Sequence, residues 1–297
     1  MPIAIDLMGS DTPPEILYEG VLNACRQDSL NCLVILTPDV AKKLAPHPLV
    51  NCVFCSDVIA MEDKPLEAVR RKKNSSIAVG LQLVKEKKAE ALISAGNTGA
   101  LMAASTFILS LKPDVERLAL IAHLPRKKGS LVVLDVGAHP DADAKQLEQL
   151  ALLGFDYLRT KKEKIKLGIL NIGIECLKGD AAVREAHQLI EKRFKDDLQV
   201  LFVGNVEARQ PFHDDIDLLV TDGFTGNIFL KTAEGSAMMV LENLKEEGVD
   251  VPFSLENRYN YQALPGAVLY GVQGTVIKCH GNATAEHLYR SIRFYFA

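Results

Sequence analysis

The chain has 297 residues, of which 48% are hydrophobic, and it carries a formal net charge of −4 with a pI of about 6.0. This composition provides apolar material for a large core, and it lacks the basic excess that is typical of nucleic-acid-binding proteins. No apolar run reaches about 18 residues, so we expect no transmembrane helix. The first residues, Met1 to Asp6, are typical of a strand and lack the basic and apolar segments of a signal peptide.

Apolar runs that predict strands alternate with helical patterns along the chain. We expect strands over residues 3–7, 33–37, 51–55, 91–95, 118–123, 131–136, 166–172, 199–204 and 216–221, with a further pair inside 267–280. The helical patterns cover residues 14–27, 65–73, 75–88, 99–111, 144–160, 180–194 and 227–247. Most strand runs are continuously apolar, which is typical of strands buried on both faces. The alternation predicts an α/β fold with a doubly wound, mostly parallel sheet.

We expect residues 1–297 to form a single domain. The sequence shows no repeat of fixed period and no low-complexity tract. Turn-forming residues are densest between Gly248 and Pro265, so an irregular excursion is expected near residues 248–265 rather than a linker between domains.

Two apolar strands run directly into turns made of Gly, Asn and Asp. Residues 91–95 lead into Gly96-Asn97-Thr98-Gly99, and residues 216–220 lead into the turn from Thr221 to Asn227. Each turn precedes a helix, whose first N–H groups have no partner within the helix and favour an anion. Ligands of open α/β sheets bind beyond the carboxyl ends of the strands. The sequence therefore predicts a site for a phosphate-bearing or carbonyl-bearing small molecule.

Several common site motifs are absent from the sequence. There is no GxGxxG after the first strand, no GxxxxGK[ST] phosphate loop and no GxSxG nucleophile elbow. The six cysteines are scattered, which favours reduced thiols in a cytosolic protein. Cys52 and Cys55 form a CxxC without a second pair, so a zinc site is not favoured and we expect no metal.

Six segments resemble motifs of the bacterial phosphate acyltransferase family called PlsX. They are Ile3–Gly9, Lys64–Ser76, Ser94–Ala103, Leu170–Gly173, Gly204–Glu207 and Asp222–Gly235. The resemblance runs in order from residue 3 to about residue 290, and it implies a fold like those of isopropylmalate dehydrogenase and phosphotransacetylase. It also implies transfer of a fatty acyl group from acyl carrier protein to inorganic phosphate, which gives acyl phosphate for phospholipid synthesis.

The resemblance further implies a cytoplasmic homodimer that needs no cofactor. Peripheral membrane contact and a downstream glycerol-3-phosphate acyltransferase are implied as further partners, although the region after Gly235 is shorter than in the family. Two alternatives stay open. One is a metal- and NAD-dependent dehydrogenase of related fold, and the other is a non-catalytic regulatory relative.

The family motifs and the turns together give the candidate site. Lys178 and Asn227 are the expected catalytic residues, because they match the lysine after Asn-Ile-Gly and the asparagine that ends Gly-Phe-x-Gly-Asn. The expected substrate-binding residues are Asp6, Gly9, Ser94, Gly96, Asn97, Thr98, Gly99, Asp135, Asn205, Asp222, Gly223, Phe224, Thr225, Gly226, Lys231 and His280. Acyl carrier protein is acidic, so we expect it to dock on the basic run Arg70, Arg71, Lys72 and Lys73, with Arg126-Lys127-Lys128 as the second choice.

Overall fold

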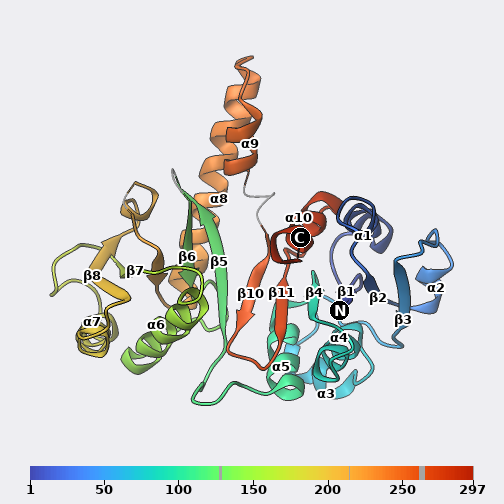
Figure 1. The fold of residues 1–297 in the computed structure, drawn as a ribbon, viewed down its shortest axis with the longest axis horizontal. Coiled ribbons are helices and arrows are strands. Elements are labelled where there is room, and N and C mark those ends of the chain that lie inside the picture. The colour runs from blue at the N-terminus through green and yellow to red at the C-terminus, as the bar shows by residue number, and fades with distance from the viewer. Residues whose placement is uncertain (127–128, 214, 261–264, 297) are drawn as a thin grey trace. The chain divides into compact units, whose positions relative to one another are not determined.

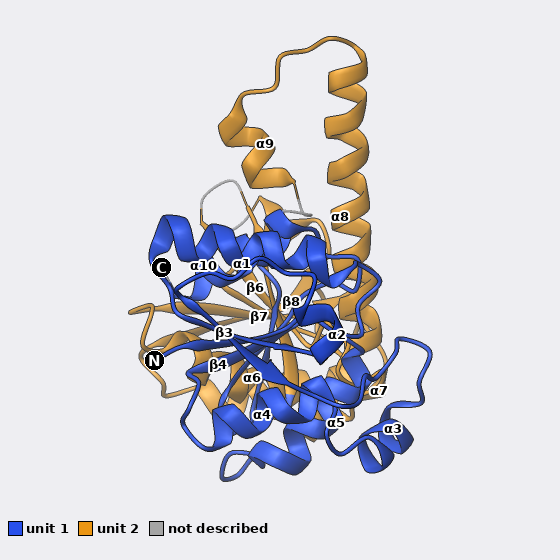
Figure 2. Ribbon diagram, turned by 90° about the vertical axis from the view of Figure 1, so that its right-hand side faces the viewer, with its two compact units in different colours: residues 1–118, 262–297 blue, residues 119–261 orange. Residues whose placement is uncertain are grey.

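The computed structural model describes residues 1–126, 129–213, 215–260 and 265–296 (Figure 1). Its contacts divide the chain into two compact units (Figure 2). Unit 1 consists of residues 1–118 and 262–297, and unit 2 consists of residues 119–261. This division concerns compactness alone, so the expectation that residues 1–297 form a single domain stays a prediction.

Unit 1 is built on a mostly parallel sheet. Its strand order is β3-β2-β1-β4-β11-β10, and among the residues described in this unit only the β10–β11 pair is antiparallel. The strands are β1 (Ile3–Asp6), β2 (Cys32–Leu36), β3 (Val50–Phe54), β4 (Ala91–Ser94), β10 (Ala267–Tyr270) and β11 (Thr275–Lys278). The helices are α1 (Pro14–Asp28), α2 (Pro38–Ala41), α3 (Pro65–Arg71), α4 (Ser76–Lys85), α5 (Thr98–Leu109) and α10 (Ala285–Phe296).

Helices cover both faces of the unit 1 sheet. Helices α1 and α10 lie side by side on one face, and α3, α4 and α5 lie on the other (Figures 1 and 2). Leu17 and Val21 of α1 and Leu288 and Ile292 of α10 are buried in one core with β1 and β2. The spacing of four residues in each pair places the apolar side chains on one helix face, as an amphipathic helix requires.

Unit 2 has a second mostly parallel sheet, with strand order β5-β6-β9-β7-β8. Among the described strand pairs of unit 2, only β5–β6 is antiparallel. The strands are β5 (Ala119–Pro125), β6 (Ser130–Leu134), β7 (Ile165–Asn171), β8 (Val200–Glu207) and β9 (Leu218–Val220). The helices are α6 (Ala144–Leu158), α7 (Ala181–Phe194), the 3-10 helix η1 (Gln210–Phe212), α8 (Gly223–Glu246) and α9 (Phe253–Tyr259).

Helix α8 is the longest helix of unit 2 and extends beyond the sheet of that unit, with α9 beside it (Figures 1 and 2). Lys245 of α8 and Glu256 of α9 join the two helices by an ion pair of 2.5 Å. No helix in the described part of the chain is both long enough and apolar enough to span a bilayer.

The predicted α/β class and the mostly parallel sheets are confirmed, and each predicted strand and helix corresponds to an observed one. The irregular excursion expected near 248–265 stays a prediction. Helix α9 lies inside that segment, and residues 261–264 are outside the described residues. This helix has seven residues, and the turn-forming residues around it favoured an irregular segment in the sequence. Helices α2 and α10 were not predicted at all.

Candidate functional site

Three polar side chains end neighbouring parallel strands of unit 1. Asp6 ends β1, Ser94 ends β4 and Lys278 ends β11, and the register pairs Asp6 with Ser94 and Ser94 with Lys278. All three side chains are buried, with exposed fractions of 1%, 0% and 7%. They therefore form a row, here called the unit 1 strand-end row, at the sheet edge where ligands of α/β proteins bind.

Hydrogen bonds hold the Asp6 carboxylate in this row. It accepts from the Ser94 hydroxyl at 2.8 Å and from the Met8 N–H at 2.9 Å. Burial raises the pKa of Asp6 to about 6, while these bonds, a bond from Ser76 and the charge of Lys278 oppose the rise. Asp6 therefore titrates close to physiological pH.

Lys278 is a site residue that sequence reasoning missed. Its ammonium group donates to the carbonyl oxygens of Ala95, at 3.4 Å, and of Cys279. The only sequence signal was a lysine that ends an apolar strand two residues before His280. His280 itself was predicted to bind substrate, and it lies exposed just after β11.

The turn from Ser94 to Gly99 follows the strand-end row and begins α5. Ser94 also accepts the N–H of Gly96 at 3.1 Å, so one hydroxyl joins the turn to Asp6. Asn97 caps α5 by accepting the N–H of Ala100 at 3.0 Å. The N–H groups of Thr98 and Gly99 have no acceptor within the helix, since they belong to its first turn. Their position suits an anion.

Asn97 also fixes the position of this turn within unit 1. Its amide nitrogen donates to the carbonyl oxygens of Ala60, Met61 and Asp63, at 3.2, 2.9 and 3.2 Å. The described contacts of Asn97 are anchoring ones, because its side-chain oxygen and nitrogen both hold backbone groups, and its binding role stays a prediction.

Two of the predicted binding glycines of unit 1 are required for close packing. A Cβ on Gly99 would lie 2.6 Å from Pro65 Cγ, at the beginning of α3. A Cβ on Gly9 would lie 2.3 Å from the Ile59 carbonyl oxygen, and Gly9 has a φ of +71°. At Gly96 the nearest atoms are the Ser94 hydroxyl and the Met8 carbonyl oxygen, at 3.3 and 3.4 Å. Gly96 is therefore the glycine with most free space in this turn.

In unit 2, Asp135 follows β6 and organises the turn after it. Its carboxylate accepts the N–H groups of Leu120, Gly137, Ala138 and His139 at 2.8 to 3.2 Å. Burial raises the pKa of Asp135, although these backbone hydrogen bonds oppose the rise. Asp135 was predicted to bind substrate, whereas its described contacts shape the turn from residue 135 to residue 139.

The start of α8 packs on this turn. Asp222 caps the helix by accepting from Thr225 N–H at 2.8 Å and from the Thr225 hydroxyl at 2.7 Å. A Cβ on Gly223 would lie 2.3 Å from the His139 carbonyl oxygen, and one on Gly226 would lie 1.9 Å from that of Asp135. Both glycines are thus required by the close approach of two backbones.

This packing brings Asn227 beside Gly137. The Asn227 side chain is exposed and lies 3.8 to 3.9 Å from the position that a Cβ on Gly137 would occupy. Phe224 and Thr225 are exposed on the same first turns of α8. Lys231, also predicted to bind substrate, lies further along α8 and forms an ion pair of 2.6 Å with Glu234.

Lys178 lies on a loop after β7 that two asparagines hold in place. Asn171 donates to the Lys178 carbonyl oxygen at 3.0 Å, and buried Asn205 donates to the Glu175 carbonyl oxygen at 2.8 Å. The Lys178 side chain is exposed, and its stem lies against Gly173. Strands β6, β9, β7 and β8 are parallel, so Asp135, Asp222, Asn171 and Asn205 lie at one edge of the unit 2 sheet.

The basic run from residue 70 to residue 73 does not act as one patch. Arg70, Arg71 and Lys73 are exposed, whereas Lys72 turns inward. Lys72 forms an ion pair of 2.5 Å with Asp63 and donates to the Val58 carbonyl oxygen at 2.8 Å. Docking on this run stays a prediction, and the charge of Lys72 is already compensated within unit 1.

Arg126, the described residue of the second docking cluster, has its charge compensated within unit 2. Arg126 is 6% exposed, forms a 3.0 Å ion pair with Asp217 and donates to the Ile216 carbonyl oxygen. Asp217 in turn accepts from Lys162 at 2.6 Å. Burial acts to raise the pKa of Asp217, but the Lys162 and Lys166 hydrogen bonds and the Arg126 charge lower it overall. Lys127 and Lys128 lie outside the described residues.

Comparison with known proteins identifies the family. A family model described as "Fatty acid synthesis protein" matches residues 1–295. The phosphate acyltransferase of Exiguobacterium sp. is 42% identical over 305 residues, which cover 96% of this chain and 91% of that protein. The phosphate acyltransferase of Staphylococcus aureus is 37% identical and covers 98% of this chain and 92% of its own length. The chain belongs to the PlsX family of phosphate acyltransferases.

Solved structures of related fold support the architecture of this PlsX family member. A phosphotransacetylase from Streptococcus pyogenes superposes with a TM-score of 0.67 at 14% identity, covering 98% of this chain and 92% of its own. Isocitrate dehydrogenase from Methylococcus capsulatus gives a TM-score of 0.54 at 10% identity, with coverages of 100% and 86%. These similarities confirm the predicted fold relationship to phosphotransacetylases and dehydrogenases.

Proposed function

We propose that this PlsX family member transfers a fatty acyl group from acyl carrier protein to inorganic phosphate, producing acyl phosphate for phospholipid synthesis. The observation that carries the proposal is the family match over residues 1–295, together with two phosphate acyltransferases at 42% and 37% identity. The alternative of a metal- and NAD-dependent dehydrogenase rests on fold alone, since those structures are far less similar in sequence.

We place the phosphate at the beginning of α5 in unit 1. The free N–H groups of the Ser94–Gly99 turn favour an anion, and the buried ammonium group of Lys278 adds a fixed positive charge at the same sheet edge. Ser94 supports this arrangement because its hydroxyl joins the turn to Asp6.

We assign Lys178 and Asn227 to the acyl carbonyl group. A phosphate oxygen attacks the thioester carbon, a C–O bond forms, and the carbonyl oxygen becomes an oxyanion. The intermediate collapses with cleavage of the C–S bond, and the carrier leaves as a thiolate. Phosphate is largely dianionic at neutral pH and the thiol is a good leaving group, with a pKa near 8.5. The reaction therefore depends on positioning and on oxyanion stabilisation rather than on a strong base.

Exposed Lys178 and Asn227 have suitable groups for this task, a cation and an amide donor on rigidly held segments. One well-placed oxyanion donor contributes about 3–4 kcal/mol to the transition state. The remaining predicted substrate-binding residues, including Thr98, Phe224 and His280, stay proposals of the same kind.

Formation of acyl phosphate tests the function directly. Purified protein is incubated with palmitoyl acyl carrier protein and phosphate, and the product is trapped with hydroxylamine as the hydroxamate. We expect hydroxamate and free carrier thiol in equal amounts, both dependent on phosphate. Sulfate in place of phosphate serves as the control. Absence of phosphate-dependent hydroxamate would contradict the proposal, and NADH formation from a hydroxy acid with NAD and Mg²⁺ would favour the dehydrogenase.

We also propose a cytoplasmic homodimer with peripheral membrane contact, as the family resemblance implies, working beside a glycerol-3-phosphate acyltransferase. Exposed apolar residues on and next to α8 and α9 support the availability of such a surface; they include Met239, Val240, Val249 and Phe253. Light scattering after size exclusion measures the oligomeric state, and sedimentation with anionic vesicles measures membrane binding. A monomer that does not sediment with vesicles would contradict this part of the proposal.

A further inference from the structure

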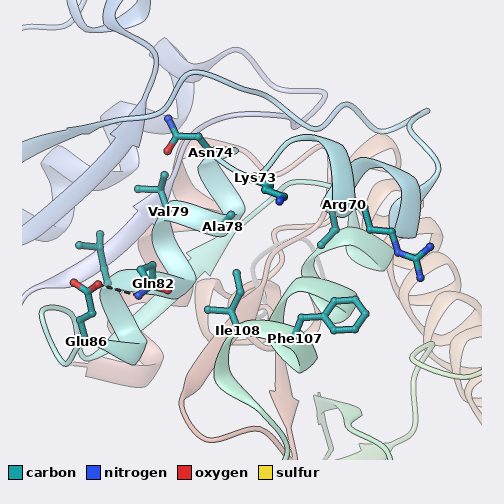
Figure 3. A pocket seen from close by; sticks show the side chains of 11 residues that line it. Arg70, Lys73, Asn74, Ala78, Val79, Gln82, Glu86, Phe107 and Ile108 are labelled. Atoms are coloured by element: carbon teal, nitrogen blue, oxygen red, sulfur yellow. Dashed lines mark hydrogen bonds between the residues drawn. The ribbon is translucent and has the colours of Figure 1, made fainter.

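A surface groove of about 810 Å³ lies between α3, α4 and α5 of unit 1 (Figure 3). Its apolar lining includes Val69 of α3, Val79 and Leu83 of α4, and Phe107 and Ile108 of α5. Phe107 is 59% exposed, although it is a large aromatic residue. Exposed aromatic side chains at the rim of an apolar groove are typical anchors of protein interfaces.

One end of the groove carries uncompensated positive charge. Arg70 and Lys73 line it, and Arg71 follows Arg70 at the end of α3. Within the described residues, no ion pair involves any of these three side chains. The neighbouring acidic residues are already engaged. Glu67 pairs with Lys64 at 3.5 Å, and Glu86 pairs with Lys88 at 2.7 Å and accepts from Gln82 at 2.8 Å.

Two helices connect the groove with the proposed phosphate site. Helix α5 begins at Thr98 in the Ser94–Gly99 turn and reaches the groove at Phe107, about 14 Å further along its axis. Helix α3 begins at Pro65, which packs against Gly99, and reaches the groove at Val69. A partner seated in the groove could therefore present a flexible thioester arm to the beginning of α5.

We propose that this groove docks acyl carrier protein, with an acidic helix of the carrier lying on the apolar lining and its carboxylates near Arg70 and Lys73. The inference rests on the proposed function, because it takes the carrier as the acyl donor. Charge complementarity favours this occupant, since Glu86, the acidic residue that lines the groove, is already paired with Lys88 and leaves Arg70 and Lys73 without a carboxylate partner among the described lining residues. An amphipathic helix in an apolar groove is also a common mode of recognition.

A fatty acyl chain fits the same groove less well. Pockets for small ligands bury most of the ligand surface. This groove is open and is flanked by Arg70, Lys73, Asn74, Gln82 and Glu86, so a bound chain would lie against charged and amide groups and water. A protein partner covers both its apolar lining and its charged end at once.

Binding of unacylated carrier protein, measured by fluorescence anisotropy at low and high salt, tests the inference. The variants are Phe107→Ser and the double variant Arg70→Glu with Lys73→Glu. Matched controls are Leu198→Ser, at a residue that is 94% exposed, and Lys192→Glu with Lys195→Glu, at exposed lysines in α7 and directly after it in unit 2. Circular dichroism and thermal melting compare the fold of every variant with the wild type.

We expect each groove variant to raise the carrier Kd roughly tenfold or more, as loss of an interface anchor does. In the charge-reversed variant, the carrier Kd should also depend less on salt concentration, since there is less electrostatic attraction between the two proteins for salt to screen. The KM for acyl carrier protein should rise in parallel in the groove variants, while their KM for phosphate stays within about twofold of the wild type. In both control variants, the carrier Kd and KM should stay within about twofold of the wild type.

Unchanged carrier binding in both folded groove variants would overturn the inference. A changed preference for acyl chain length with unchanged carrier binding would also overturn it, and would assign the groove to the chain. The binding measurement needs no turnover. If the wild type formed no acyl phosphate but bound the carrier through this groove, the docking surface would stand and the proposed function would fail.

Discussion

The Ser94 hydroxyl donates a 2.8 Å hydrogen bond to the buried carboxylate of Asp6, and so joins the ends of two neighbouring parallel strands. The same hydroxyl accepts the N–H of Gly96, which begins the turn before α5. One side chain thereby links a titratable group, a sheet edge and the proposed phosphate site. The predictions for unit 1 follow from this arrangement.

Replacing Asp6 should make stability less dependent on pH. The pKa of Asp6 is 3.8 in the reference state and about 6 in the fold, so the folded protein holds this proton more tightly. Asp6 therefore lowers the free energy of unfolding. This loss of stability grows as pH rises between about 4 and 6, and it reaches about 3 kcal/mol above that range. Asp6→Asn removes the buried charge. Urea unfolding should show the variant more stable than the wild type near pH 7.5 and equal to it near pH 3.5, and an equal difference at both pH values would contradict the assignment.

Lys278→Met should weaken phosphate binding. The substitution keeps the length of the buried side chain but removes the charge that we place beside the phosphate. The KM for phosphate should rise about tenfold or more, because a hydrogen bond or ion pair to a charged group contributes about 1.5–3 kcal/mol. The KM for acyl carrier protein is the internal control and should stay within about twofold. An unchanged phosphate KM in a folded variant would remove Lys278 from the site.

Lys178→Ala and Asn227→Ala should each lower turnover by roughly 10²-fold, as loss of an oxyanion donor does. Both side chains are exposed, so the melting temperature should hardly change. Lys195→Ala on the surface after α7 is the matched control for loss of an exposed lysine. Near wild-type turnover in both site variants would refute the catalytic roles.

Asn205→Ala should act through Lys178. The buried amide of Asn205 holds the Glu175 carbonyl oxygen, three residues before Lys178, and its loss leaves that loop less constrained. We expect a loss of stability of about 1–3 kcal/mol, measured by urea unfolding, and a lower kcat. A double variant with Lys178→Ala distinguishes positioning from simple destabilisation. Its kcat should equal that of Lys178→Ala alone, whereas fully additive losses would contradict a positioning role.

Two glycines of α8 form a matched pair. Gly226→Ala should destabilise the protein strongly, because its Cβ would lie within 2 Å of the Asp135 carbonyl oxygen and one of the two backbones must shift. Gly235→Ala meets no atom within 4 Å, so it should stabilise the same helix by about 0.5–1 kcal/mol. Urea unfolding of the two variants measures both effects, and equal changes in the two would contradict the packing described here.

The sequence was sufficient for the strands, most helices and the two glycine turns, because buried parallel strands and helix caps leave local patterns. It was insufficient to predict Lys278 as a site residue, because the position of Lys278 in the site depends on its pairing with Ser94 on another strand. It also gave no sign that Lys72 pairs with Asp63 or that Arg126 is buried with Asp217. A run of like charges in the sequence does not indicate which of its side chains point inward. That depends on ion-pair partners that are distant in the sequence.

The discontinuous construction of unit 1 has a consequence for the order of events during synthesis. Strand β11 lies beside β4, and α10 packs against α1, yet β11 and α10 are made only after all of unit 2. When unit 2 has been synthesised with its full set of strands, the nascent residues 1–118 still have one edge of β4 unpaired. The apolar face of α1 is also still uncovered at that stage. Translation thus gives the continuous unit the first opportunity to fold, and closure of the α1 core is among the last steps.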